Sequence, residues 1–242
     1  MAAGESTKDR VVSAAVELFN ESGVSAVTTN HIAAHLGMSP GNLYYHYANK
    51  EEIVRAAFDR MNAAADEIWK LEPPPAGKKK PAVDVLGLQR IVLGNLRLYA
   101  EYIFFARELT TLLRADPVLR ERYAAISDRR MGQLVEVLRP LVAAGLLRNV
   151  GDDDDLRALA ESAWLIGLFC VPYAETTEAL AAAGRKRTAK ARVAATNAAV
   201  EKGALLVLHL FKPYMEPIAY TALVVLVRQQ LERESGSNTS QG

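Results

Sequence analysis

The sequence predicts an all-α protein, and three observations support this fold class. Apolar residues recur at helical spacing along the whole chain, as they do at Val11, Ala14, Ala15, Leu18 and Phe19. No segment of useful length alternates apolar with polar residues, as a half-buried strand does. Glycine, proline and capping residues stand at the ends of the periodic segments, where helices start and stop.

The composition predicts a folded protein of the cytoplasm. The chain has 242 residues, half of them hydrophobic, which is enough to bury a core. Its formal net charge of +1 gives no overall attraction to nucleic acid, so such binding must come from a local patch. The single cysteine, Cys170, cannot form an internal disulfide, which fits a reducing compartment. The N-terminus lacks a secretory apolar segment, and the longest apolar runs are too short to span a bilayer, so no membrane contact is expected.

Three short helices are expected before residue 48. The first follows Ser6, a good N-cap residue, and stops before Gly23, a residue type common at helix C-termini. The second begins at Thr28 or Thr29 and ends at Leu36.

A tight turn, "GMS" at 37–39, joins the second helix to the third. Ser39 is expected to cap the third helix, which begins at Pro40, where proline loses no helical hydrogen bond. Leu43 and Tyr47, at i and i+4, fit its inner face. Two helices joined by a short turn containing glycine form a helix-turn-helix.

Longer helices are expected in the rest of the chain. A fourth starts after Asn49, with Glu52 at the capping-box position, and runs towards Trp69. The proline-rich segment 72–81 then interrupts helical structure. Beyond it, helical patterns cover roughly 83–99, 103–114, 117–144, 154–180, 192–211 and 214–234, and the polar tail at 236–242 is expected to be disordered.

Polar side chains of the third helix and the following turn suit a DNA backbone. The outward-pointing set is expected to be Asn42, Tyr44, Tyr45, His46 and Lys50. Tyrosine hydroxyls and the imidazole can donate to phosphate oxygens, and the lysine adds a positive charge. Asn42 has the amide that pairs with an adenine edge in the major groove.

The segment "TTNHIAAHLGMSPGNLYYHYANKEEI", residues 28–53, resembles the helix-turn-helix of the tetracycline-repressor (TetR) family of bacterial regulators. The resemblance covers about residues 10–60. It implies a three-helix DNA-binding domain at 1–48 and a helical-bundle domain for ligand binding and dimerisation at 49–235. It also implies ten DNA-contacting positions: Thr28, Thr29, Asn30, Ser39, Gly41, Asn42, Tyr44, Tyr45, His46 and Lys50. At Asn30 the chain departs from the family, which often has a basic residue there.

The resemblance implies a ligand-responsive transcriptional regulator. We expect a homodimer that represses from a palindromic double-stranded DNA operator and is released by a small molecule. The apolar segments 160–173 and 220–231 are the expected dimer contacts. Two alternatives stay open: an activator of the same family, and a constitutive architectural DNA binder without ligand. An enzyme is not expected, and no catalytic residue or cofactor is assigned, because the chain has no glycine-rich phosphate loop and no "GxSxG" motif.

The charge balance of the first sixty residues is unusual for a DNA-binding segment. Five basic residues face seven acidic ones, a net charge of −2 with histidine neutral. DNA affinity is then expected to rest on neutral donors and few phosphate charges, with a shallow salt dependence for each monomer.

A ligand pocket is expected in the second domain, whose apolar residues exceed what one buried stripe per helix requires. The candidate lining residues are Tyr99, Tyr102, Phe105, Arg107, Leu109, Trp164, Phe169, Tyr173 and His209. Each of them also suits an ordinary core position. A mainly apolar lining favours a lipophilic effector, and an acyl chain, an aromatic compound and a drug are all compatible with it.

Three further clusters receive the simpler interpretation. His31 and His35, at i and i+4, have a spacing that can hold zinc, but surface polarity explains them and no metal site is assigned. The basic runs at 78–80 and 185–187 are interpreted as solvated loops. The acidic run at 152–155 is interpreted as the cap of a following helix rather than a cation site.

Overall fold

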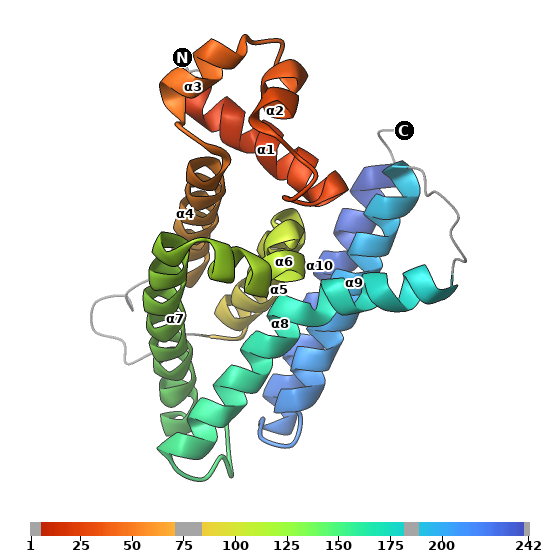
Figure 1. Cartoon of the computed structure of the whole chain (residues 1–242). Coiled ribbons are helices and arrows are strands. Elements are labelled where there is room, and N and C mark those ends of the chain that lie inside the picture. The colour runs from red at the N-terminus through yellow and green to blue at the C-terminus, as the bar shows by residue number, and fades with distance from the viewer. Residues whose placement is uncertain (1–5, 71–83, 182–188, 240–242) are drawn as a thin grey trace. The chain divides into compact units, whose positions relative to one another are not determined.

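The structure is a computed structural model that describes residues 6–70, 84–181 and 189–239, and its described elements are all helices (Figure 1). The helices are α1 Thr7–Ser22, α2 Thr29–His35, α3 Pro40–His46, α4 Lys50–Trp69, α5 Val85–Glu101, α6 Ile103–Ala115, α7 Pro117–Ala143, α8 Asp153–Ala181, α9 Ala189–Phe211 and α10 Pro217–Thr239. Within the described ranges, extended residues pair only in one isolated bridge, Leu147 with Met215. The predicted all-α class is confirmed.

The chain forms two compact units, and each contains residues from two stretches of sequence. The first unit comprises Met1–Ala65 and Tyr102–Ile126, and the second comprises Asp66–Glu101 and Ser127–Gly242. Two of the three boundaries between the units therefore fall inside the continuous helices α4 and α7, and the third falls at Tyr102, between α5 and α6. The predicted domain boundary at residue 48 lies within the first unit, because that unit also includes α6 and parts of α4 and α7.

Aromatic rings form the core of the first unit. Phe19 of α1 packs against Phe104 of α6, with ring centroids 5.3 Å apart. Phe58 of α4 stacks on Phe105 of α6 at 5.0 Å, and Tyr123 of α7 lies beside both rings. Because such rings bury large areas and favour offset or tilted contacts, this cluster joins four helices into one unit.

Polar contacts also hold α1 to α6 within the first unit. Asn20 uses both its side chain and its backbone: its Oδ1 accepts from the Phe104 N–H at 3.1 Å, and its carbonyl accepts from Arg107 at 2.7 Å. Glu108 accepts from the Val24 N–H at 2.8 Å. These bonds satisfy backbone groups at the end of α1 and the start of α6 that the helices themselves leave unpaired.

In the second unit α8 packs along α9, and α5 contacts α8, α9 and α10 (Figure 1). The α8–α9 crossing is close at Gly203, where an added Cβ would lie 2.5 Å from the Cys170 sulfur. Cys170 is buried there as a small apolar residue, as the sequence predicts, and burial raises the pKa of its thiol to about 11.

Helix α9 begins at Ala189 rather than near 192, and both ends of α10 differ from the sequence-based expectation. Helix α10 begins at Pro217 rather than near 214, because residues 212–215 form a turn that places Met215 beside Leu147. The same helix extends to Thr239, over residues 236–239 of the predicted tail. The remaining tail residues and the basic runs at 78–80 and 185–187 lie outside the described residues.

The expectation that no apolar segment is long enough to span a bilayer is wrong, because two helices contain segments of sufficient length. The segments Asp153–Thr177 of α8 and Val193–Phe211 of α9 are long and apolar enough by composition alone. Two such helices are weak evidence for a membrane protein, since core helices of soluble proteins share this composition. Here α8 and α9 pack on each other and on α5.

Candidate nucleic-acid interface and ligand cavity

Local capping determines where α2 begins. The Thr28 hydroxyl accepts from the His31 N–H at 3.2 Å, and the His31 Nδ1 accepts from the Thr28 N–H at 3.3 Å, which is a capping box. His35, at the other end of α2, lies 3.2 Å from Glu17 of α1. Both histidines therefore have protein partners, and no group of three metal-ligating side chains occurs among the described residues.

Helix α3 is also capped as predicted. The Ser39 hydroxyl accepts from the Asn42 N–H at 3.2 Å, and Pro40 occupies the first helical position. Gly37 adopts a φ of 63° in the preceding turn, where a side chain would be strained. Leu43 is fully buried and Tyr47 nearly so, which confirms the predicted inner face of the helix.

The outer face of α3 presents polar and aromatic groups. Asn42 and Gly41 are exposed, and nothing lies within 4 Å of a Cβ built at Gly41. Tyr45 is 85 % exposed, and the ring of His46 meets it edge-on with centroids 5.1 Å apart. Tyr44 is half exposed, and its hydroxyl lies 2.9 Å from that of Thr29 at the start of α2. The predicted contact residues of α2 and α3 thus lie at least partly open to solvent.

The prediction that Lys50 points outward is wrong. Its ammonium donates to the carbonyls of Val24 at 2.6 Å and Val27 at 2.9 Å, in the turn between α1 and α2. Lys50 is the first residue of α4, where the positive end of the helix dipole disfavours a cation, and backbone carbonyls offset this repulsion. Two of the three N–H donors of the ammonium are therefore used within the first unit.

Four of the predicted pocket residues belong to the first unit instead of a cavity. Tyr102, Phe105 and Leu109 are buried in its core, and the Tyr102 hydroxyl accepts from Arg60 at 2.9 Å. Arg107 is exposed and bonds the Asn20 carbonyl. Tyr102, Phe105 and Leu109 face the core of the first unit because the chain turns at Tyr102, between α5 and α6.

The second unit contains a cavity of about 90 Å³, several times the space that one water molecule needs. It is lined by Trp69, Leu88, Ile91, Val92, Asn95, Leu96, Tyr99, Leu134, Val137, Leu138, Ala163, Trp164, Gly167, Val207 and Phe211. Tyr99 and Trp164 are thus the two predicted pocket residues that the structure places on it. Phe169, Tyr173 and His209 are exposed and lie outside the cavity.

Sequence reasoning missed the α5 face of this cavity. Leu88, Ile91, Val92, Asn95, Leu96 and Tyr99 follow helical spacing on one side of α5. Asn95 is the single hydrogen-bonding amide on this apolar stripe. A lone amide at an inner-face position was the available signal for a binding residue.

The polar groups of the cavity wall are linked in pairs. Trp69 donates to the Asn95 Oδ1 at 3.1 Å, and the Asn95 amide donates to the Ile91 carbonyl at 2.7 Å. Trp164 donates to the Tyr99 hydroxyl at 3.1 Å. Both indole N–H groups are therefore satisfied within the wall.

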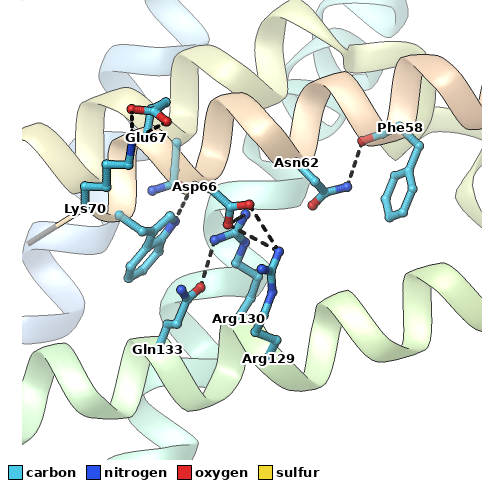
Figure 2. A network of polar contacts seen from close by, with 10 residues as sticks. Phe58, Asn62, Asp66, Glu67, Lys70, Arg129, Arg130 and Gln133 are labelled. Carbon is cyan, nitrogen blue, oxygen red and sulfur yellow. Dashed lines mark hydrogen bonds and ion pairs between the residues drawn. The ribbon is translucent and has the colours of Figure 1, made fainter.

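An ionic network around the buried Arg130 joins α4 to α7 in the second unit (Figure 2). Arg130 of α7 lies 2.7 Å from Asp66 of α4 and donates to Gln133 at 2.8 Å, and Arg129 approaches the same carboxylate at 3.2 Å. Burial lowers the pKa of the Arg130 guanidinium, and the charge of Asp66 opposes this effect. The network holds the end of α4 to α7 and balances the buried charge.

Helices α8 and α10 each expose an apolar stripe. On α8, Leu165, Phe169 and Tyr173 are 51 %, 41 % and 61 % exposed at i, i+4 and i+8. On α10, Ile218 and Val225 are 78 % and 46 % exposed. Both stripes lie in or next to the segments that the sequence predicts for dimer contacts.

The acidic run before α8 acts as predicted, since Asp152 caps the helix by accepting from two backbone N–H groups.

Comparison with known proteins gives consistent matches. A family model described as "Bacterial regulatory proteins, tetR family" matches residues 11–57, and one described as "Bacterial transcriptional repressor" matches residues 65–223. The HTH-type transcriptional regulator TtgR of Pseudomonas putida is 30 % identical over 103 residues, which cover 43 % of this chain and 46 % of TtgR. The chain thus spans about half the length of this curated relative.

Solved structures extend the likeness over most of the chain. A TetR-family transcriptional regulator from Marinobacter aquaeolei VT8 matches with a TM-score of 0.76 and 27 % identity, covering 93 % of this chain and 98 % of that one. A gamma-butyrolactone receptor matches with a TM-score of 0.59 at 17 % identity, covering 93 % and 96 %. The second likeness concerns the fold alone.

Proposed function

This chain belongs to the TetR family of bacterial transcriptional repressors, and we propose that it is a homodimeric repressor that a small molecule releases from a palindromic DNA operator. The observation that carries the proposal is the construction of α3. This helix buries Leu43 and leaves Asn42, Tyr44 and Tyr45 exposed. A short helix that packs on one side and has such an outer face suits insertion into a major groove.

Neutral donors would provide much of the DNA contact. Tyr45 and Asn42 carry side-chain polar groups with no partner among the described residues, so both can bond phosphate or base edges. Lys50 contributes less than expected, because its ammonium is largely occupied by backbone carbonyls. Because the net charge over the first sixty residues is −2, we expect DNA affinity to depend only weakly on salt concentration.

Two copies are needed for selective binding, because a single helix-turn-helix reads few base pairs. In a symmetric dimer the two recognition helices enter major grooves about 34 Å apart and read a palindrome. The exposed stripes on α8 and α10 are the surfaces we assign to this dimer. Covering them would remove apolar side chains such as Phe169 and Ile218 from water.

The cavity of the second unit is the proposed effector site. Its lining is mainly apolar, which favours a lipophilic effector. Trp69, the last residue of α4, lines the cavity, whereas Lys50, the first residue of the same helix, bonds the turn before α2. A ligand that binds one arrangement of α4 better than another would shift the population between them. We expect the protein to act in the cytoplasm, without membrane contact.

The test is fluorescence anisotropy with labelled DNA from upstream of the protein's own gene, a scrambled duplex, and two salt concentrations. We expect tight binding to the first duplex and much weaker binding to the second. Equal, weak and strongly salt-dependent binding to both duplexes would contradict self-regulation. Equally weak binding to every member of a library of upstream regions would contradict the proposal that the protein is a repressor.

A further inference from the structure

We propose that the cavity takes an uncharged, mainly apolar molecule with one hydrogen-bonding group, and that Asn95 recognises that group. This inference rests on the proposed function, since it assigns the ligand class of the effector site. It is carried by the hydrogen bonds of Asn95, the absence of charge on the described cavity wall and the aromatic rings around it.

The orientation of the Asn95 amide is fixed by two bonds of opposite kind. An indole N–H can only donate, so Trp69 identifies the acceptor oxygen of the amide, at 3.1 Å. A carbonyl can only accept, so Ile91 identifies the amide nitrogen, at 2.7 Å. The amide oxygen has a second lone pair and the nitrogen a second N–H. Neither has a partner among the described residues, so Asn95 has one donor and one acceptor left on the cavity wall.

The other polar groups of the cavity wall have less hydrogen-bonding capacity left for a ligand. Trp69 and Trp164 have each used their single N–H, on Asn95 and on Tyr99. The remaining lining residues in the described part of the chain are aliphatic or aromatic, apart from Tyr99 itself. Among the lining residues we therefore assign recognition of a hydrogen-bonding ligand group to Asn95, whose amide keeps both a donor and an acceptor, whereas the Tyr99 hydroxyl already accepts from Trp164.

A charged ligand is disfavoured. No charged side chain lines the cavity within the described residues. The nearby cation Arg130, one helical turn before Leu134, is already balanced by Asp66 at 2.7 Å and by Gln133 at 2.8 Å. Transfer of an ionised group into such a wall, without a partner charge, has a large desolvation cost.

Aromatic rings on several helices favour a ligand that contains a ring. Trp69 of α4, Tyr99 of α5, Trp164 of α8 and Phe211 of α9 all line the cavity. Aromatic side chains pair with another ring in stacked or edge-to-face geometry. The chain has two tryptophans, and both lie on this wall, so their fluorescence reports binding at this site.

The experiment compares three probes of nearly the same shape by isothermal titration calorimetry. Phenol carries one hydroxyl, toluene carries none, and benzoate carries a charge. We expect the phenol to bind about tenfold more tightly than the toluene, the value of one hydrogen bond to a buried polar partner, and the benzoate to bind more weakly than the phenol. Quenching of tryptophan fluorescence by the same phenol would locate the binding at the cavity.

Asn95→Leu is the decisive variant, with Asn197→Leu, on the exposed part of α9, as its matched control. We expect the leucine at 95 to reduce the phenol-to-toluene preference to about one, and the control to keep the full preference. An unchanged preference in Asn95→Leu, a benzoate that binds as tightly as the phenol, or no binding of any probe would each overturn the inference. If Asn95→Leu does not fold, the three-probe comparison on the natural chain still decides the ligand class.

Operator binding of the same preparation separates the two proposals. If the protein binds its operator and takes none of the probes, the ligand assignment fails and the DNA-binding function stands. If it binds no DNA but shows the expected probe preference, the repressor proposal fails and the cavity assignment stands.

Discussion

The ammonium of Lys50 donates a hydrogen bond of 2.6 Å to the backbone carbonyl of Val24. A second bond, of 2.9 Å, reaches the Val27 carbonyl in the same turn. Helix α2 begins directly after this turn, so Lys50 fixes the start of α4 against the entry to the helix-turn-helix. A residue that by its position in the sequence resembles a phosphate contact is thus part of the support of the first unit.

We expect Lys50→Met to lower the free energy of unfolding by about 1–3 kcal/mol, because two carbonyls lose their donor. Urea denaturation followed by circular dichroism measures this loss. Lys70→Met is the control: Lys70 pairs with Glu67 on an exposed surface, and its loss should change stability by less than about 0.5 kcal/mol. Equal stability of the two variants would show that the Lys50 ammonium faces solvent, as the sequence first suggested.

Tyr45→Phe should weaken operator binding on every DNA sequence by a similar factor. The Tyr45 hydroxyl is on an 85 % exposed side chain, and a phosphate contact carries no base information. The loss of one such bond predicts about a fivefold decrease in affinity, measured by anisotropy on specific and scrambled duplexes. Tyr173→Phe, on a 61 % exposed ring of α8, keeps the ring that would pack in a dimer contact and should leave affinity unchanged. A change in base preference with Tyr45→Phe would refute the phosphate role.

Asn42→Ala should change base preference without a large loss of non-specific binding. The Asn42 side chain is exposed near the start of α3, and its backbone N–H is already used on Ser39. Its side-chain amide has no partner among the described residues and is available to a base edge, where a good pair contributes about 1–3 kcal/mol of discrimination. Selection from a randomised operator library should show relaxed preference at one base pair in each half-site. Selection of the natural operator without change would argue that Asn42 reads no base.

The helix-turn-helix could be predicted from the sequence because its signals are local. Ser6, Thr28 and Ser39 each accept from a backbone N–H three residues later, as their positions before apolar periodic segments indicate. Leu43 and Tyr47 are buried because a helix repeats every 3.6 residues. None of these contacts requires knowledge of distant parts of the chain. Lys50 differs, since its partners lie 26 and 23 residues earlier in the chain.

The cavity could not be predicted in the same way, because it depends on which faces of long helices meet. Helix α8 carries apolar residues around more than one face, so Trp164 and Phe169 look equivalent in the sequence. In the structure Trp164 lines the cavity and Phe169 is 41 % exposed. Tyr99 lines the cavity and Tyr102 is buried in the first unit, because α5 ends between them and the chain turns into α6.

Phe169→Glu should give monomers if the exposed stripe of α8 forms the dimer interface. A glutamate in the centre of an apolar contact would be buried without a partner charge. Sedimentation velocity measures the state of association, and circular dichroism confirms that the variant folds. Val193→Glu, at a 55 % exposed position of α9, is the control and should remain a dimer. A dimer that persists in Phe169→Glu would place the interface on another face.

The ion pair between Arg55 and Asp116 should make the first unit sensitive to acid. Arg55 lies 2.7 Å from the Asp116 carboxylate, and both side chains are largely buried. Burial raises the pKa of Asp116, but hydrogen bonds from the Leu119 N–H, the Arg55 guanidinium and the Val118 N–H outweigh it, so the pKa of Asp116 is lower than its ordinary value. A lowered pKa means that the folded state prefers the ionised form. The stabilisation is therefore complete above the unfolded pKa of about 4 and is lost as the pH falls through the lower, folded-state pKa.

Asp116→Asn isolates this contribution. At pH of about 7 the variant should be less stable than the natural chain by about 2 kcal/mol, because Arg55 loses its partner charge. As the pH falls below about 4, protonation removes the same charge from the natural chain, and the difference should shrink. Asp59→Asn, whose partner Arg122 is exposed, should cost less than about 1 kcal/mol at neutral pH. Urea unfolding at several pH values measures both variants. A stability difference for Asp116→Asn that does not change with pH would show that the loss comes from hydrogen bonds or packing that the amide changes, and not from the charge of the carboxylate.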